Sequence, residues 1–403
     1  MTFELNNDQR IYFGLDPVRL EWDRVILKGD TYRPDSILYF EGEVIKRHIV
    51  STEYRYEENH YNDLTRQRSI LLPVTSKGKE RKLTASVLES RQPQGVYCVL
   101  DTYGRILIGN YNTQTAFYDS FWENNSKSES APISIHVEKF VYTSPPKYLS
   151  DIEAFKHSKR KNIKFKHGDF FAFKINRSEY GFGRVLLNID KLRKTDIISK
   201  EHGLSLIMGK PVLIKVYAYT SKSKNSIEQL THASSLPSDY IMDNKLFYGE
   251  YEIIGNKPLH ADEIDFPKSY GRHIDGRRNS VFFQWGLIHV ELPFSAFNKY
   301  LSAKNPFVPE SSPSSMVSNP YGYYSIGFSP NYNGQDIKNA ISNNGTFDYQ
   351  NNATFKGSFD LRNPQNQSIL EEVMATFGLH AKKGYYENCL QTKTITTVDL
   401  LKL

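Results

Sequence analysis

The sequence is poor in cysteine. It contains two cysteines, Cys98 and Cys389, which lie far apart in the chain. Two such residues cannot build the disulfide framework of a small secreted domain, and they do not have the spacing of zinc ligands. We therefore expect a reduced, intracellular setting.

Long hydrophobic runs are also missing. No uninterrupted apolar stretch approaches the roughly 18 residues that a membrane-spanning helix requires. The N-terminal stretch "MTFELNNDQRIYFG" has no basic region followed by an apolar run, so it does not have the pattern of a signal peptide. These features predict a soluble, cytoplasmic protein with no membrane partner.

Motifs that carry catalysis are not found. The sequence has no HExxH zinc motif, no GxSxG nucleophile motif and no cysteine in a nucleophile signature. Its 11 histidines are scattered, and isolated histidines are more often structural than metal-ligating. His167 and Asp169 flank Gly168 without an obvious third ligand, which leaves open a metal site completed by distant residues. We predict no catalytic residue, no metal ligand and no cofactor.

Aromatic side chains are abundant, at 13% of the chain with 27 Tyr and 24 Phe. These residues favour the pleated, half-buried surfaces of β-sheets. A chain of 403 residues is long enough for two or three domains. We predict a mainly β (α+β) fold with two β-rich domains of curved antiparallel sheets or barrels, few helices and a loop-rich C-terminal extension.

The first domain is expected over residues 1–150, and its role is unknown. The runs "SILYFEGEVI" and "GVYCVLDTYGRILIGNY" predict strands, the second a hairpin that turns at Gly104. Between them lies a charged stretch, "STEYRYEENHYNDLTRQR", and after them "ISIHVEKFVY" alternates as one more strand. The punctuating stretch "TSPPKYLSD" marks the boundary that follows.

The second domain is expected over residues 160–300. Alternating Phe171, Phe173 and Ile175 predict a strand, after which a turn allows "YGFGRVLLNID" to return antiparallel. The runs "GKPVLIKVYAYT", "LFYGEYEIIGN" and "SVFFQWGLIHVEL" predict three further strands, and "NSIEQLTHASSL" predicts a short helix. These elements indicate a curved sheet or barrel with one helix.

Residues 301–403 are expected to form a C-terminal extension with long loops, because they are rich in Asn, Ser, Gly and Pro. One helix is predicted near residues 367–378. Ser368 is its expected N-cap, and Gly378 is the residue expected to end it.

A basic run lies between the two domains, with six Lys or Arg residues from Lys156 to Lys166. It is either a contact for the phosphates of nucleic acid or for an acidic partner, or a solvated connector. The net charge of +6 is small for a dedicated nucleic-acid-binding protein of this size and does not decide between these alternatives.

The glycines of the "YGFG" stretch have two possible explanations. A phosphate-binding loop needs glycines that lead into a helix, whereas Gly181 and Gly183 lead into strand-like sequence. Tyr180, Phe182 and Arg184 share one face of that strand, and the missing side chains on the other face allow a ring or a second backbone to lie close. We predict that this stretch is β-framework.

A stretch of mixed charge before the last aromatic strand is the candidate binding surface. Its basic part lies in a Gly-containing loop, where guanidinium groups suit carboxylates and phosphates, although a solvated hairpin tip has the same composition. Acidic residues precede this loop, and alternating charge suits protein–protein recognition. The predicted contact residues are Asp262, Glu263, Asp265, Arg272, His273, Arg277 and Arg278.

The stretch "IKFKHGDFFAFKINRSEYGFGRVL" resembles the start of the immunity protein 26 family, a bacterial domain associated with polymorphic toxin systems. That family opens with a basic strand, a Gly-Asp step, an apolar strand and a turn, and continues with Tyr-Gly-x-Gly-Arg-Val. The resemblance covers about residues 162–300, and "VFFQWGLI" is similar to a strand that closes the domain. The family positions are filled here by Gly168, Asp169, Phe171, Ala172, Tyr180, Gly181, Gly183, Arg184, Val185, Gln284, Trp285 and Gly286.

The resemblance implies a protein that binds a cognate protein toxin and neutralises it by occluding its active surface, without catalysis. A small phosphotriesterase is grouped with the family, so a metal-dependent hydrolase is an alternative that the resemblance allows. A nucleic-acid-associated defence protein that uses the basic run is a second alternative.

Overall fold

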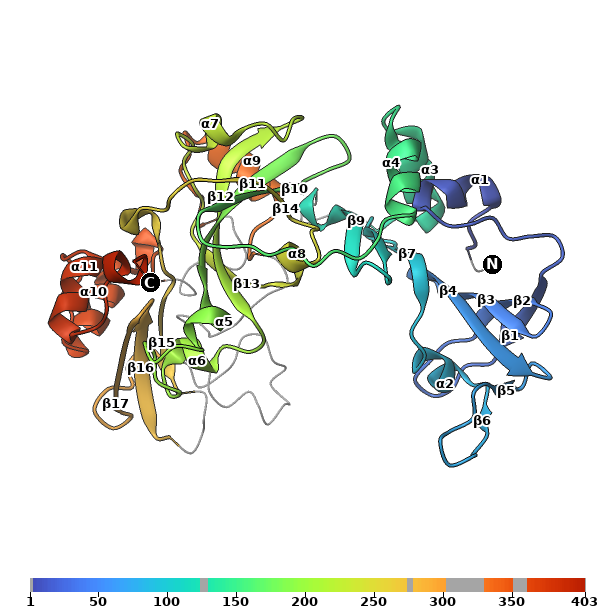
Figure 1. Ribbon diagram of the computed structural model, residues 1–403, viewed down its shortest axis with the longest axis horizontal. Helices are drawn as coiled ribbons and strands as arrows, with labels where there is room; N and C mark the ends of the chain where they lie inside the picture. The colour runs from blue at the N-terminus through green and yellow to red at the C-terminus, as the bar shows by residue number, and fades with distance from the viewer. Residues whose placement is uncertain (1–2, 124–129, 274–277, 302–329, 351–360, 403) are drawn as a thin grey trace. The chain divides into compact units, whose positions relative to one another are not determined.

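The computed structural model describes residues 3–123, 130–273, 278–301, 330–350 and 361–402 (Figure 1). In this part of the chain strands outweigh helices, at 31% against 25%, and each α-helix spans only four to ten residues. The predicted β-rich fold class is confirmed. The chain divides into two compact units, of which unit 1 comprises Met1–Ile163, Lys174–Glu179 and Tyr248–Glu250, and unit 2 comprises Lys164–Phe173, Tyr180–Phe247 and Tyr251–Leu403.

Unit 1 contains a nine-stranded sheet in the order β1-β2-β3-β4-β7-β8-β9, with β5 paired to β4 and β6 paired to β5. Neighbouring strands are antiparallel. The strands are β1 (Asp23–Leu27), β2 (Ser36–Glu41), β3 (Val44–Ser51), β4 (Arg55–Arg66), β5 (Ile70–Leu71), β6 (Arg81–Lys82), β7 (Gln94–Asp101), β8 (Ile106–Asn110) and β9 (Thr115–Asp119). The helical elements are α1 (Asn7–Arg10), η1 (Ile11–Phe13), α2 (Ala85–Glu89), η2 (Ser120–Trp122), α3 (Ile133–Tyr142) and α4 (Tyr148–Lys156).

The predicted hairpin of unit 1 is confirmed as β7 and β8. Val96, Cys98 and Leu100 are buried on one face of β7, and Gly104 adopts a φ of +82° in the turn. The charged stretch before it, however, is the 12-residue strand β4, which lies between β3 and β7. A stretch with this many charged residues does not have the pattern of a central strand. Glu58 on β4 is nevertheless buried, because Arg10, far away in the sequence, pairs with it.

The prediction of a strand over "ISIHVEKFVY" is wrong, because these residues form helix α3. Ile133, Val137 and Phe140 are buried at helical spacing, and Phe140 stacks on Phe13 with ring centroids 5.2 Å apart. Ile133, Ile135 and Val137 also alternate at a period of two, so the first half of the segment fits both structures. Packing against η1 and α4 selects the helix.

Unit 2 contains a five-stranded sheet in the order β13-β12-β11-β10-β14 and a three-stranded sheet in the order β15-β16-β17. In the described part of the chain each sheet is open, so the barrel alternative is not realised. The strands are β10 (Asp169–Lys174), β11 (Tyr180–Asn188), β12 (Pro211–Ser221), β13 (Asp239–Met242), β14 (Glu252–Asn256), β15 (Lys268–Arg272), β16 (Ser280–Trp285) and β17 (Ile288–Pro293). The helical elements are α5 (Ile189–Leu192), α6 (Gly203–Leu206), α7 (Ile227–Leu230), α8 (Asn244–Phe247), η3 (Ala261–Glu263), α9 (Gly334–Ser342), η6 (Pro364–Asn366), α10 (Gln367–Thr376), α11 (Tyr385–Thr392) and α12 (Thr397–Leu400).

Two strand predictions in unit 2 need correction. The run "SVFFQWGLIHVEL" is a hairpin of β16 and β17 and not one strand, because Gly286 has a φ of +59° and reverses the chain. In "LFYGEYEIIGN" only the second half is a strand, β14, and the first half ends helix α8. The short helix predicted in "NSIEQLTHASSL" is confirmed as α7.

The C-terminal helices complete the core of unit 2. The predicted helix is α10, and Gly378 follows it with a φ of +74°, but its N-cap is Asn366 and not Ser368. Helices α9, α11 and α12 were not predicted. Phe377 packs against Tyr270 and Phe283, so the three-stranded sheet and the C-terminal helices share one hydrophobic core (Figure 1).

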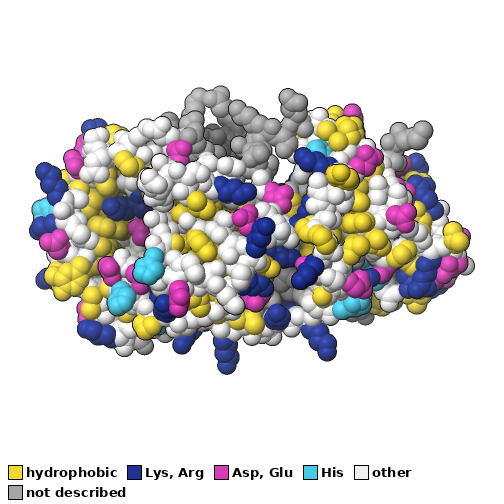
Figure 2. All heavy atoms as spheres, turned by 90° about the horizontal axis from the view of Figure 1, so that it is seen from above, with side chains coloured by type: hydrophobic (Ala, Val, Ile, Leu, Met, Phe, Trp, Pro, Cys, Tyr) yellow, Lys and Arg dark blue, Asp and Glu magenta, His cyan; other side chains and the backbone are white. Residues whose placement is uncertain are grey.

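Charged side chains of both signs are interspersed on the face drawn in Figure 2, where Lys and Arg alternate with Asp and Glu. This distribution agrees with the small net charge of +6.

Candidate binding surface

The Gly-Asp step of the family motif is a tight turn. Gly168 has a φ of +82°, and a Cβ atom at this position would lie 2.3 Å from the carbonyl oxygen of Lys257. The buried Asp169 carboxylate accepts the Lys166 backbone N–H and the Asn256 side-chain amide, each at 2.8 Å. This pair therefore fixes the start of β10 against the end of β14.

Gly183 of the "YGFG" stretch allows close packing. A Cβ atom at Gly183 would lie 2.3 Å from the ring of Phe171 and 2.6 Å from the carbonyl oxygen of Lys215. The Phe171 ring stacks on Tyr251 with a centroid distance of 5.2 Å and an interplanar angle of 6°. Phe171 occupies the space that a side chain at position 183 would need, which supports the framework interpretation.

We expect Gly183→Ala to lower the free energy of unfolding by about 1–3 kcal/mol, because its methyl group has to displace an aromatic ring and a strand backbone. Chemical denaturation of the full chain measures the change. Gly384→Ala is the matched control, since a Cβ atom at Gly384 has its nearest neighbour at 3.8 Å. Equal stability of the two variants would contradict the close packing at Gly183.

Arg184 of the same motif is buried and binds the segment that follows β14. One guanidinium nitrogen donates to the Glu263 carboxylate, and another donates at 2.9 Å to the carbonyl oxygens of Lys257 and Pro258. Its guanidinium carbon lies 4.6 Å from the ring centroid of Phe170. Arg184 therefore ties the centre of the five-stranded sheet to the start of the candidate surface.

Lys215 is the cross-strand neighbour of Arg184, on β12. Its ammonium group lies 3.2 Å from the same Glu263 carboxylate, so two buried cations share one anion. Burial lowers the pKa of Lys215, although Glu263 acts in the opposite direction. For Glu263, burial alone would raise the pKa, but the His260 backbone N–H and the two cations hold it below its usual value.

The predicted acidic contact residues have different environments. Glu263 is part of the internal ion pairs just described, and its side chain is 24% exposed. Asp265 accepts the Ser238 backbone N–H at 3.2 Å and an Arg362 guanidinium N–H at 2.7 Å, with half of its side chain exposed. Asp262 is exposed on η3. Asp262 and Asp265 are thus exposed, whereas Glu263 is only partly so.

Two of the predicted basic contact residues, His273 and Arg278, lie beside Glu291 on β17. Arg278 donates to a Glu291 carboxylate oxygen at 3.3 Å, and the Nε2 atoms of His289 and His273 lie 3.0 and 3.7 Å from the same oxygen. His273 is buried, and Arg272 places its guanidinium carbon 5.1 Å from the ring centroid of Phe294. Arg277 lies outside the described residues.

Gln284 orients this second cluster. Its amide donates to the carbonyl oxygen of Gly286, so its own oxygen faces Nδ1 of His289 at 2.7 Å and that nitrogen is the donor. Burial lowers the pKa of His289, although the Glu291 carboxylate acts in the opposite direction. The neighbouring Trp285 packs on Tyr385 with ring centroids 5.0 Å apart. Both residues thus support the β16–β17 hairpin.

The structure therefore places six of the seven predicted contact residues, all except Arg277, in distinct environments and adds partners that the sequence did not predict. Lys215 binds Glu263 and Arg362 binds Asp265, while Glu291 binds Arg278 and is itself bound by His289. One signal was present in the sequence, since Lys215 interrupts the apolar strand run "PVLIKVY". A lysine at such a position is rarely buried without a partner.

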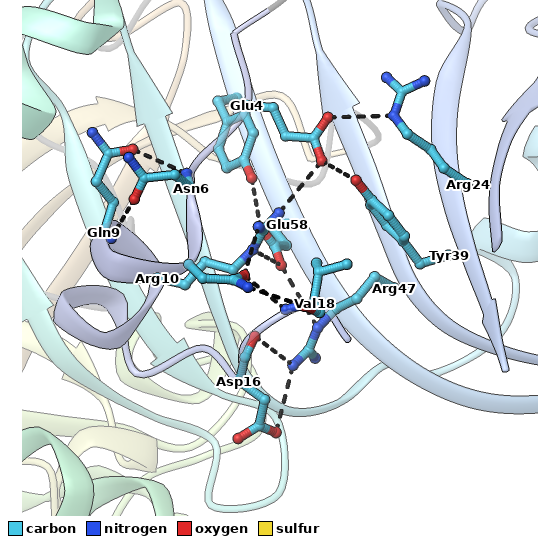
Figure 3. A network of polar contacts seen from close by, with 12 residues as sticks. Glu4, Asn6, Gln9, Arg10, Asp16, Val18, Arg24, Tyr39, Arg47 and Glu58 are labelled. Carbon is cyan, nitrogen blue, oxygen red and sulfur yellow. Dashed lines mark hydrogen bonds and ion pairs between the residues drawn. The ribbon is translucent and has the colours of Figure 1, made fainter. Parts of the chain in front are cut away.

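A third charged cluster lies in unit 1 (Figure 3). Glu58 is fully buried, and its carboxylate lies 3.2 Å from Nε of Arg10 and 3.6 Å from Nε of Arg47. The Tyr56 hydroxyl donates to the same carboxylate. Because Arg10 belongs to α1 and Glu58 to β4, the cluster fixes the N-terminal helix on the sheet.

Metal and membrane sites were sought in the described part of the chain. No group of three or more His, Cys, Asp or Glu side chains there has an arrangement that holds a metal ion. Among the same residues, no helix has the length and hydrophobicity needed to span a bilayer.

Comparison with protein-family models gave a match to part of the chain. Searches of curated proteins and of solved structures found nothing similar to this chain. A family model, described next, matches the chain only as far as residue 280. Gln284 and Trp285 lie beyond that residue, so their role as family positions stays a prediction. The matching family model is that of Immunity protein 26, which covers residues 166–280, from the Gly168–Asp169 turn to the start of β16, and confirms over this segment the resemblance that the sequence predicted.

Proposed function

We propose that this protein is an immunity protein of a bacterial polymorphic toxin system, which acts in the cytoplasm by binding a cognate protein toxin without catalysis. The observation that carries the proposal is the match of residues 166–280 to the Immunity protein 26 family. The burial of the family-motif residues supports a binding function over a catalytic one. Asp169, Gly183 and Arg184 pack and bond within the fold, which leaves recognition to the surface around them.

The proposed toxin-binding surface runs from Asp262 to Arg278. Asp262 is exposed, and the side chains of Asp265 and Arg278 are 50% and 39% exposed. Interface residues held by internal ion pairs lose less side-chain entropy when a partner docks. The ties to Arg362 and Glu291 therefore favour Asp265 and Arg278 as preformed contacts.

Co-expression tests the proposal. The full chain, produced together with the toxin encoded by the neighbouring gene, is expected to restore growth and to copurify with the toxin. Asp262→Lys should weaken the complex, because it reverses an exposed charge at the proposed surface, while Glu201→Lys reverses an exposed charge elsewhere in unit 2 and should not. Persistent toxicity with both proteins soluble would contradict the proposal.

The same purified protein distinguishes binding from hydrolysis. The hydrolase alternative requires a bound divalent metal and turnover of a phosphotriester such as paraoxon. Elemental analysis and a turnover assay are expected to show neither. Stoichiometric metal together with turnover would replace the binding proposal.

A further inference from the structure

The basic run Lys156–Lys166 has a composition unlike the rest of the chain. Six of its 11 residues are Lys or Arg, and no Asp or Glu occurs between Glu153 and Asp169. The chain as a whole has 51 Lys or Arg against 45 Asp or Glu, so the run is a local excess of positive charge in the sequence.

The backbone of the run has no regular secondary structure from residue 158 to residue 166, and its Lys and Arg side chains in this range are exposed. Phe165 is buried between Lys164 and Lys166, which both point to solvent. The Lys166 backbone N–H is bonded to Asp169, which fixes this end of the run. Alternate residues of an extended chain lie about 7 Å apart on one side, so the two lysines form a spaced pair of charges.

Arg160 is held in place by an aromatic side chain. Its guanidinium carbon lies 4.6 Å from the ring centroid of Tyr248, and it donates to the Tyr248 hydroxyl at 2.7 Å. This arrangement orients the guanidinium group without neutralising it.

The charges of the run are not compensated within the described part of the chain. Lys156 pairs with Asp16. Among the described residues, none of the other five cations has a carboxylate within ion-pair distance; these are Lys159, Arg160, Lys161, Lys164 and Lys166. Five exposed positive charges on one short segment thus remain available to an anion.

A nucleic-acid backbone fits this arrangement better than an acidic protein surface does. Lysine is depleted in protein–protein interfaces, because its flexible side chain and hydrated charge are costly to bury. Phosphate backbones, by contrast, are bound by exposed lysines in a sequence-independent way, with counterion release as the driving force. Several like charges close together in the sequence also suit a polyanion, which carries many phosphates.

We propose that the segment Lys159–Lys166 binds the phosphate backbone of nucleic acid without sequence preference. This inference goes beyond the proposed toxin binding and uses other residues, so either one can fail alone. With three to five phosphate contacts, raising the salt from about 50 to about 200 mM is expected to weaken duplex binding roughly 40- to 500-fold.

Fluorescence anisotropy of the full chain with a labelled 20-base-pair DNA duplex of arbitrary sequence tests the inference. The variant Lys159→Glu/Lys161→Glu/Lys164→Glu/Lys166→Glu reverses four exposed charges and is expected to abolish binding at low salt. The matched control Lys77→Glu/Lys79→Glu/Lys382→Glu/Lys383→Glu makes the same change in net charge at exposed positions elsewhere and is expected to bind within about threefold of the parent protein. Circular dichroism and the Tm show that both variants are folded.

Three outcomes would overturn the inference. One is a parent protein that does not bind the duplex at low salt. Another is an equal loss of binding in both variants, which would indicate an effect of net charge alone. The last is tighter binding of poly-L-glutamate than of the duplex, which would assign the segment to an acidic polypeptide.

Discussion

Replacing Glu58 with alanine is expected to lower the free energy of unfolding of unit 1 by about 3–5 kcal/mol, the usual result of removing one partner of a buried ion pair. Glu58 is fully buried between Arg10 and Arg47. Without it, two buried guanidinium groups lose the carboxylate that lies between them. Glu4 and Asp16 lie 3.5 Å from Arg10 and Arg47 and are more exposed, so they do not replace it.

Hydrogen–deuterium exchange is the appropriate measurement, because it reports on peptides of unit 1 and unit 2 separately in a chain that need not unfold in one step. Glu80→Ala is the control. It removes an ion pair in which both side chains are more than half exposed, and it is expected to change the stability by less than about 1 kcal/mol.

A triple variant tests the physical cause. Arg10→Met/Arg47→Met/Glu58→Leu removes the buried charges together and is expected to be close to the parent protein in stability, since apolar replacement of a buried ionic cluster is often neutral. If Glu58→Ala were as stable as Glu80→Ala, the buried network would not be what fixes α1 on the sheet.

Replacing Glu263 with glutamine is expected to lower the stability of unit 2 by about 2–4 kcal/mol, because Arg184 and Lys215 would then share no carboxylate. Glu263 is partly exposed, which places the loss at the lower end of the range for buried pairs. Asp262→Asn is the matched control on the neighbouring residue, which is exposed, and should change the stability by less than about 0.5 kcal/mol.

The dependence on pH gives an independent check of the Glu263 ion pairs. The pKa of Glu263 is lower in the folded protein than its usual 4.5, so the unfolded chain binds the proton more readily. The stabilisation is therefore present above pH 4.5 and is lost as the pH falls through the folded-state pKa. The difference between the parent protein and Glu263→Gln should shrink in acid. An equal difference at pH 7 and pH 3 would contradict this assignment.

The sequence predicted those parts of the fold whose pattern is local. The β7–β8 hairpin, β12 and the packing at Gly183 follow from alternation, turn residues and missing side chains. Helix α3 could not be predicted in this way, because the first apolar residues of the segment fit a strand as well as a helix. Packing against Phe13 and Tyr148 favours the helix. Strand β4 could not be predicted either, because its buried Glu58 is stable only beside Arg10 of α1 and Arg47 of β3.

The candidate surface was less predictable than the framework for the same reason. Arg184 belongs to a recognisable motif, but its partner Glu263 lies 79 residues later in the chain. Arg362 and Asp265 are likewise joined only by the fold. Sequence spacing cannot distinguish an acid that faces a partner from one that is bound internally, since both occur in the same charged stretch.

The hydrophobic core shared by β15–β17 and the C-terminal helices limits where the chain can be cut into fragments. Phe377 covers Tyr270 and Phe283, although the family match ends at residue 280. In a fragment that stopped at Tyr300, Tyr270 and Phe283 would lose their contacts with Phe377, and we expect the apolar surface exposed in this way to favour aggregation. We therefore expect the matched segment to need sequence outside the match to bury its core.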